Sequence, residues 1–118
     1  MISVCAISAV TLIVENMGRS CRFYSRIPGF KLVCGGSATD SFTTYEVGVG
    51  QSKNNSRTFL NLELAGPINT DYYIDDRRKH FGGIIFHTEY VDRFYFYLKE
   101  DRDLSAGILI EDEPRDAP

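Results

Sequence analysis

The stretch AVTLIVENMGRSCRFYSRIPGF, residues 9–30, decides the fold. Residues 9–14 alternate with the period of two that is typical of a strand, and they are apolar enough for a strand buried on both faces. Asn16 can cap the free backbone N–H groups of a helix that begins at Met17. The Pro-Gly pair at 28–29 ends this helix. The stretch therefore predicts a strand, an amphipathic helix and a returning strand.

Two further strand patterns follow in the first half of the chain. Residues 42–47 are rich in β-branched and aromatic side chains. The pattern in residues 57–64 is the cleanest, because three leucines fall on one face and three other side chains fall on the opposite face. The leucines are Leu60, Leu62 and Leu64, and the other face carries Phe59, Asn61 and Glu63. With a strand expected at 30–34, the first half predicts the order βαβββ.

The second half of the chain repeats part of the first. It predicts a strand, a helix and a short strand, at residues 83–88, 91–98 and 107–110. A shift of 74 residues places Leu12 on Phe86. The same shift places Met17 on Val91, so that strand, turn and helix keep their register. The pattern stops after strand, helix and strand, and we expect a second, incomplete βαβββ module.

Size and composition indicate one ordinary globular domain. The 118 residues are 43% apolar and 25% charged, and the formal net charge of −3 argues against a nucleic-acid partner. No stretch is long enough to span a membrane. The three cysteines are odd in number and suit reduced thiols in a cytoplasmic protein. We expect a single domain at 1–118, with the first module at about 1–65, a linker at 66–79 and the second module at 80–118.

The opening motif resembles that of a known superfamily. Residues 10–20 read VTLIVENMGRS, and Phe23-Tyr24 and Gly29-Phe30 follow. This spacing is similar to that of the vicinal oxygen chelate superfamily, which includes glyoxalase I, bleomycin-resistance proteins and extradiol dioxygenases. The resemblance implies an α+β fold in which paired βαβββ modules form a cupped mixed sheet with a concave cleft. The segment from residue 111 resembles a family member that stops before its last strands.

The resemblance also implies which residues line the cleft. The cavity face of the first strand would carry Ala9, Thr11 and Ile13. Aromatic side chains would stack on a ligand, and Asn61 and Glu63 would orient its polar groups. The expected ligand-binding residues are Thr11, Ile13, Tyr45, Phe59, Asn61, Glu63, Ile85 and His87.

The resemblance argues against a metal centre in this chain. Metal-using members carry a ligand on the first strand of each module, and these positions correspond to Ala9 and Gly83, whose side chains cannot coordinate. Glu63 and His87 are the remaining candidates, and two ligands are too few for a catalytic metal. His87 also reads as a locally hydrogen-bonded histidine and Glu63 as a solvated strand end. We expect no metal and no other cofactor.

Three functions remain open after these arguments. The first is binding or sequestration of a small, partly apolar molecule, as in the bleomycin-resistance branch. The second is a lyase, isomerase or dioxygenase in which a divalent metal polarises vicinal oxygens and Glu63 is a ligand or catalytic base. The third is a non-catalytic module whose sheet forms an interface. An exposed sheet edge recruits partners, and relatives pair modules across a dimer, so we expect a homodimer.

Overall fold

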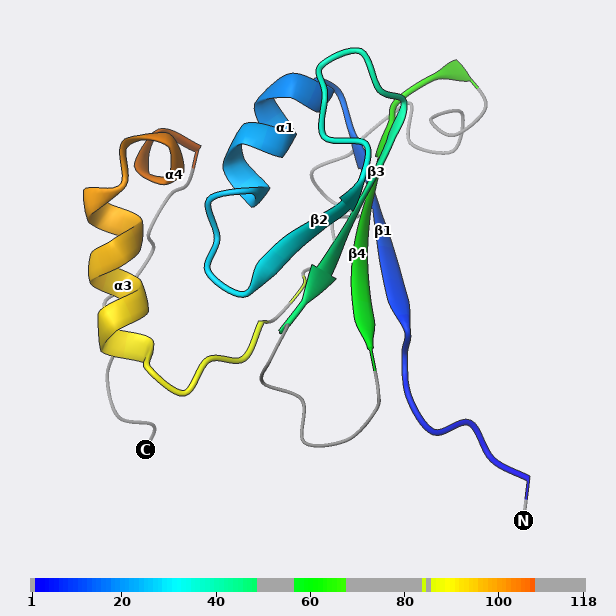
Figure 1. Cartoon of the computed structure of the whole chain (residues 1–118), viewed down its shortest axis with the longest axis horizontal. Helices are drawn as coiled ribbons and strands as arrows, with labels where there is room; N and C mark the ends of the chain where they lie inside the picture. The colour runs from blue at the N-terminus through cyan, green and yellow to red at the C-terminus, as the bar shows by residue number, and fades with distance from the viewer. Residues whose placement is uncertain (1, 49–56, 68–83, 85, 108–118) are drawn as a thin grey trace. The chain divides into compact units, whose positions relative to one another are not determined.

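The computed structural model describes residues 2–48, 57–67, 84 and 86–107. The chain divides into two compact units, residues 1–72 and 73–118. Among the described residues, the first unit contains a four-stranded mixed sheet with helix α1 on one side of it (Figure 1). The second unit contains the helices α3 and α4. The predicted α+β class is confirmed.

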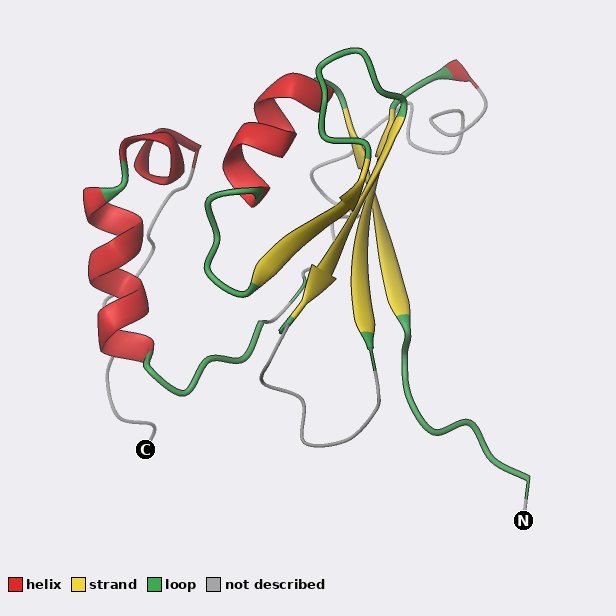
Figure 2. Ribbon diagram, viewed as in Figure 1, coloured by secondary structure: helices red, strands yellow, loops and turns green. Residues whose placement is uncertain are grey.

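The first unit has the predicted βαβββ order. Its elements are β1 (Ala9–Val14), α1 (Met17–Tyr24), β2 (Phe30–Cys34), β3 (Phe42–Val47) and β4 (Thr58–Leu64). The strands lie in the order β1-β4-β3-β2, and Figure 2 shows them in one twisted sheet. Strand β1 is parallel to β4, whereas the β4–β3 and β3–β2 pairs are antiparallel. Strand β4 therefore lies in the centre of the sheet, between the first and third strands of the chain.

Helix α1 begins as the sequence predicts and ends earlier. The Asn16 side-chain oxygen accepts a hydrogen bond from the Arg19 amide at 2.9 Å, which satisfies a backbone donor of the first turn. The sequence predicts a helix that continues to the Pro-Gly pair at 28–29, but α1 ends at Tyr24. The chain then turns, and the Ile27 amide donates to the Tyr24 carbonyl at 3.2 Å. Ile27 is still buried, so the turn adds to the same apolar face.

The pairing of β1 places its alternating side chains on the predicted faces, but the strand is not buried on both faces as expected, because none of its six side chains is buried. Val10 and Leu12 lie beside Leu60 and Leu62 of β4. Both leucines are buried, and they share their face with the β3 side chains that contact α1. Because successive strand residues point to opposite faces, Ala9, Thr11 and Ile13 lie on the face away from α1.

Two buried side chains of β3 attach the sheet to α1 by hydrogen bonds. The Thr43 hydroxyl donates to Met17 Sδ at 3.4 Å and accepts from the Gly36 amide at 2.9 Å. The Tyr45 hydroxyl donates to the Cys21 carbonyl at 3.2 Å and lies 2.8 Å from Ser25 Oγ. Neither Thr43 nor Tyr45 is exposed to solvent. Their polar groups are therefore satisfied inside the core, as buried polar groups must be.

The position of Tyr45 corrects one sequence-based prediction. Tyr45 was expected to line the cleft with Thr11 and Ile13. It pairs with Leu60 in the antiparallel β3–β4 ladder, so its side chain points to the α1 face. There its ring lies 6.1 Å from that of Phe30. Tyr45 is a core residue and is inaccessible to a ligand on the other face.

The second unit confirms the predicted helix and corrects the predicted strand before it. Helix α3 spans Val91–Glu100, and a short helix, α4, spans Arg102–Gly107. The strand was expected at 83–88, but the described residues among these, 84 and 86–88, have no strand structure. A strand was also expected at 107–110. Gly107 is instead the last residue of α4, and residues 108–110 lie outside the described residues. No described helix has the length and apolarity needed to cross a membrane.

The buried hydroxyl of Tyr45 should make the first unit less stable at strongly alkaline pH. Burial raises the pKa of Tyr45 to about 12, against 10.0 in the unfolded chain, so the folded state favours the neutral phenol. The stabilisation is complete below pH 10 and is lost as the pH rises through about 12. We expect the urea midpoint to fall in this window, and less steeply in Tyr45→Phe.

Burial also raises the pKa of Tyr24, so Tyr24→Phe should remove a smaller part of the same pH dependence. Tyr45→Phe itself should lower the free energy of unfolding at neutral pH by about 1 kcal/mol, because the hydrogen bond from the Tyr45 hydroxyl to the Cys21 carbonyl is lost, although the Ser25 amide still donates to that carbonyl. An unchanged alkaline slope in Tyr45→Phe would contradict the assignment.

Candidate functional site

The sheet face opposite α1 brings most of the predicted site residues together. We call it the open face and define it by nine residues of three neighbouring strands. They form three rows across the sheet, Ala9–Phe59–Glu46, Thr11–Asn61–Thr44 and Ile13–Glu63–Phe42. None of the nine side chains is fully buried. The predicted residues Thr11, Ile13, Phe59, Asn61 and Glu63 therefore share one accessible surface.

The central row is a hydrogen-bonded polar line. The Thr44 hydroxyl donates to Asn61 Oδ1 at 2.8 Å, and Asn61 Nδ2 donates to Thr11 Oγ1 at 3.3 Å. These two bonds fix which way the amide points. A carboxamide has two N–H donors and an oxygen with two lone pairs, so each end of Asn61 retains capacity for one more partner. The row can therefore present an oriented donor and an oriented acceptor to a ligand.

The row beside it places a carboxylate between two apolar side chains. Glu63 lies next to Ile13 of β1 and next to Phe42 of β3. Ile13 is 40% exposed and Phe42 is 41% exposed. An amphiphilic molecule could contact these apolar groups and direct a polar group to Glu63 or Asn61.

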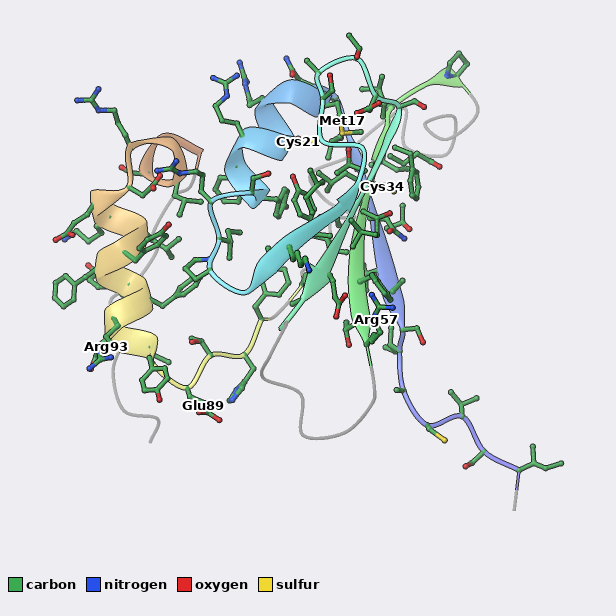
Figure 3. The ribbon with its side chains drawn as sticks, viewed as in Figure 1. Met17, Cys21, Cys34, Arg57, Glu89 and Arg93 are labelled. Carbon is green, nitrogen blue, oxygen red and sulfur yellow. The ribbon has the colours of Figure 1, made fainter. Side chains whose placement is uncertain are left out.

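The third row carries an ion pair on an aromatic ring. Arg57 Nη2 donates to Glu46 Oε1 at 2.6 Å, and the Arg57 guanidinium carbon lies 5.0 Å from the centroid of the Phe59 ring. Figure 3 shows Arg57 at the start of β4. The hydrogen bond from Arg57 lowers the pKa of Glu46, with a smaller contribution from the charge of Lys31. The Glu46 carboxylate is therefore held in an ion pair with Arg57.

Of the three other predicted site residues, one lies on the helix face of the sheet and two belong to the second unit. Tyr45 points to the opposite side, as described above. Ile85 lies outside the described residues, and His87 is an exposed residue of the second unit. Sequence reasoning also missed Phe42, Thr44 and Glu46. The alternation in residues 42–47 places these three on one face, but only the pairing with β4 shows which face it is.

The donor set of the open face does not fit a divalent metal. The position expected to hold a ligand on β1 is Ala9, whose methyl group cannot coordinate. Gly83 lies outside the described residues. The open face carries two carboxylates, Glu46 and Glu63, and Glu46 is bonded to Arg57, whereas a catalytic metal typically takes about three protein ligands. Within the described part of the chain, no three His, Cys, Asp or Glu side chains are grouped so that they could hold a metal ion.

No family model, no curated protein and no solved structure matches this chain.

Removing the arginine should release the carboxylate of the third row. We expect Arg57→Ala to raise the pKa of Glu46 toward its ordinary value, because the hydrogen bond from Arg57 is the largest cause of its lowering. Titration of the glutamate carboxyl resonance by NMR measures this shift. Arg22→Ala, on the exposed side of α1, is the matched control and should leave the pKa of Glu46 unchanged. An equal response to both substitutions would contradict the ion pair.

Proposed function

We propose that this chain is a small-molecule-binding protein of the vicinal oxygen chelate type, which holds a partly apolar ligand on the open face without a metal. The observation that carries the proposal is the row Thr11–Asn61–Thr44, in which two hydrogen bonds orient an accessible amide. The βαβββ order of the first unit and the opening motif support the superfamily assignment.

The flanking rows define the chemical class of the ligand. Phe42 and Ile13 offer apolar contact on one side of the amide, and Phe59 offers a ring on the other. Asn61 would pair with a carbonyl, hydroxyl or amide group of the ligand. Because its amide is already oriented, little side-chain entropy is lost on binding. The ligand we propose is a small molecule with an apolar or aromatic body and at least one neutral polar group.

A second wall completes the binding site in this proposal. A single sheet face contacts a ligand from one side, whereas small-molecule sites enclose most of the ligand surface. We propose that the protein is a homodimer in which both chains contribute walls to the cleft.

The cysteines support a reducing compartment. Cys5, Cys21 and Cys34 are free, and Cys5 and Cys34 are exposed. Exposed thiols stay reduced in the cytoplasm and are oxidised in secretory compartments. We therefore include a cytoplasmic location in the proposal.

Ligand binding on the open face can be tested by a thermal-shift screen of small aromatic and amide-containing molecules. For a molecule that raises the melting temperature, we expect Asn61→Ala and Phe59→Ala each to weaken binding about tenfold, or about 1.4 kcal/mol. The affinity is measured by titration calorimetry. Arg22→Ala, on α1, is the control and should bind normally. Unchanged affinity in both open-face variants would show that the molecule binds elsewhere.

Metal independence is a separate prediction. We expect no stoichiometric zinc, nickel, iron or manganese in the purified protein, and no loss of thermal stability on adding a chelator, because Glu63 alone holds a divalent ion weakly. Elemental analysis measures the metal content. One bound equivalent that is lost in Glu63→Ala and retained in Glu89→Ala would favour the metal-dependent lyase, isomerase or dioxygenase instead.

A further inference from the structure

The ion pair on the open face exposes its cation and covers its carboxylate. The Arg57 side chain is 61% exposed, whereas the Glu46 side chain is 18% exposed. Their hydrogen bond joins Arg57 Nη2 to Glu46 Oε1 at 2.6 Å. A molecule that approaches this row from solvent therefore meets the guanidinium before it meets the carboxylate.

A second cation lies beside the same carboxylate. Lys31 is directly opposite Glu46 in the β2–β3 ladder, so it lies on the open face as well, and its charge contributes to the lowered pKa of Glu46. Two cations thus flank one carboxylate, in a chain whose formal net charge is −3. The row keeps one positive charge in excess, and a local positive region attracts anions.

The other carboxylate of the open face is too distant to cancel this charge. Glu63 lies four residues after Phe59 on β4, which is about 13 Å at the rise of a strand. Exposed charges that are separated by more than about 8 Å are largely screened at physiological salt. The open face therefore has a positive end at the start of β4.

The guanidinium at this end is held in place from two sides. Glu46 accepts a bond at one edge, and the guanidinium carbon lies 5.0 Å from the centroid of the Phe59 ring. A guanidinium has several N–H donors in a planar fork, and Glu46 is the one described residue that accepts from the Arg57 side chain. The remaining donors can form the paired bonds that carboxylates accept from arginine, and little side-chain entropy is lost because the group is already oriented.

We propose that Arg57 is the anion-binding residue of the open face, and that the ligand carries a carboxylate in addition to the neutral polar group that bonds to Asn61. A carboxylate matches the single excess positive charge of the row, whereas a phosphate dianion would remain half-neutralised. Phe59 and Asn61 are two residues apart on β4, about 7 Å, which a benzene ring with substituents at opposite ends spans. This inference rests on the proposed function and specifies its ligand class as an aromatic acid.

Two probes that differ in charge test the carboxylate site. They are 4-acetamidobenzoate and its neutral counterpart 4-acetamidobenzamide, which share the ring and the acetamide group. We expect the carboxylate to bind about tenfold more tightly in titration calorimetry, because hydrogen bonds to charged groups are the stronger ones. The preference should shrink as sodium chloride is added, since Arg57 is exposed.

A matched pair of arginine substitutions locates the preference. In Arg57→Gln we expect the two probes to bind with about equal affinity. Arg22→Gln removes the same charge from an exposed position of α1, and the tenfold preference should persist. Asn61→Ala should weaken both probes by the same factor. Because the preference is a ratio measured on one protein, a general loss of stability does not abolish it.

The titration of Glu46 by NMR reports where the carboxylate binds. Bound 4-acetamidobenzoate should raise the pKa of Glu46, because it competes for the donors of Arg57 and brings a second negative charge beside this group. The neutral probe should raise it less. An equal response to both probes would show that the carboxylate does not lie beside Arg57.

The outcomes separate this inference from the proposed function. Equal affinity for the two probes, or a preference that survives Arg57→Gln, overturns the inference and leaves binding on the open face in place. Binding of neither probe also overturns it, and the thermal-shift screen then tests the proposed function alone. Tighter binding of 4-acetamidophenyl phosphate than of the carboxylate would overturn the choice of a carboxylate.

Discussion

The position of β4 between β1 and β3 is the constraint on which the first unit depends. Its alternating side chains are held in register by a parallel pair on one side and an antiparallel pair on the other. Leu60 and Leu62 therefore lie in the core, and Asn61 lies on the open face. A slip of one residue would exchange these faces completely. The same pairing thus determines both the core and the candidate site.

Hydrogen bonds then fix where α1 sits on the sheet. Apolar contact is non-directional, and leucines alone would allow the helix to settle in several positions. Thr43 and Tyr45 add directional contacts to Met17, to the Cys21 carbonyl and to Ser25. Each of these polar groups must be satisfied once it is buried, so alternative helix positions leave donors or acceptors unpaired. The buried polar groups therefore select one arrangement of helix and sheet.

The sequence was sufficient where one physical signal dominated. Leucine alternation in residues 57–64 predicted the faces of β4, and the Asn16 cap predicted the start of α1. The sequence did not decide the faces of residues 42–47, because each of the two sets of alternate residues contains both polar and aromatic side chains. Tyr45 was therefore assigned to the wrong face, because the pairing partner decides the face and a pairing partner is not a local property.

In the second half of the chain, the internal repeat predicted the helix correctly but not the strand before it. Helices α1 and α3 begin 74 residues apart, at Met17 and Val91, as the repeat predicted. The strand before α3 is absent from the described residues 84 and 86–88. A helix takes its hydrogen bonds from its own segment, whereas a strand needs a neighbour. Helix α4 was missed, although Asp101 Oδ1 accepts from the Leu104 amide at 3.1 Å and so marks its start.

The separation of the two sheet faces has a consequence for function. The helix face of β4 and β3 holds the buried leucines and the hydrogen bonds to α1, whereas the open face holds accessible groups. Substitutions of accessible side chains usually change stability little, and substitutions in a core change it by several-fold more. The chemistry of the open face can therefore change without loss of the fold. For the same reason, the ligand in the proposed function would be selected by Asn61, Glu63 and their neighbours, because a fold by itself does not determine what binds to it.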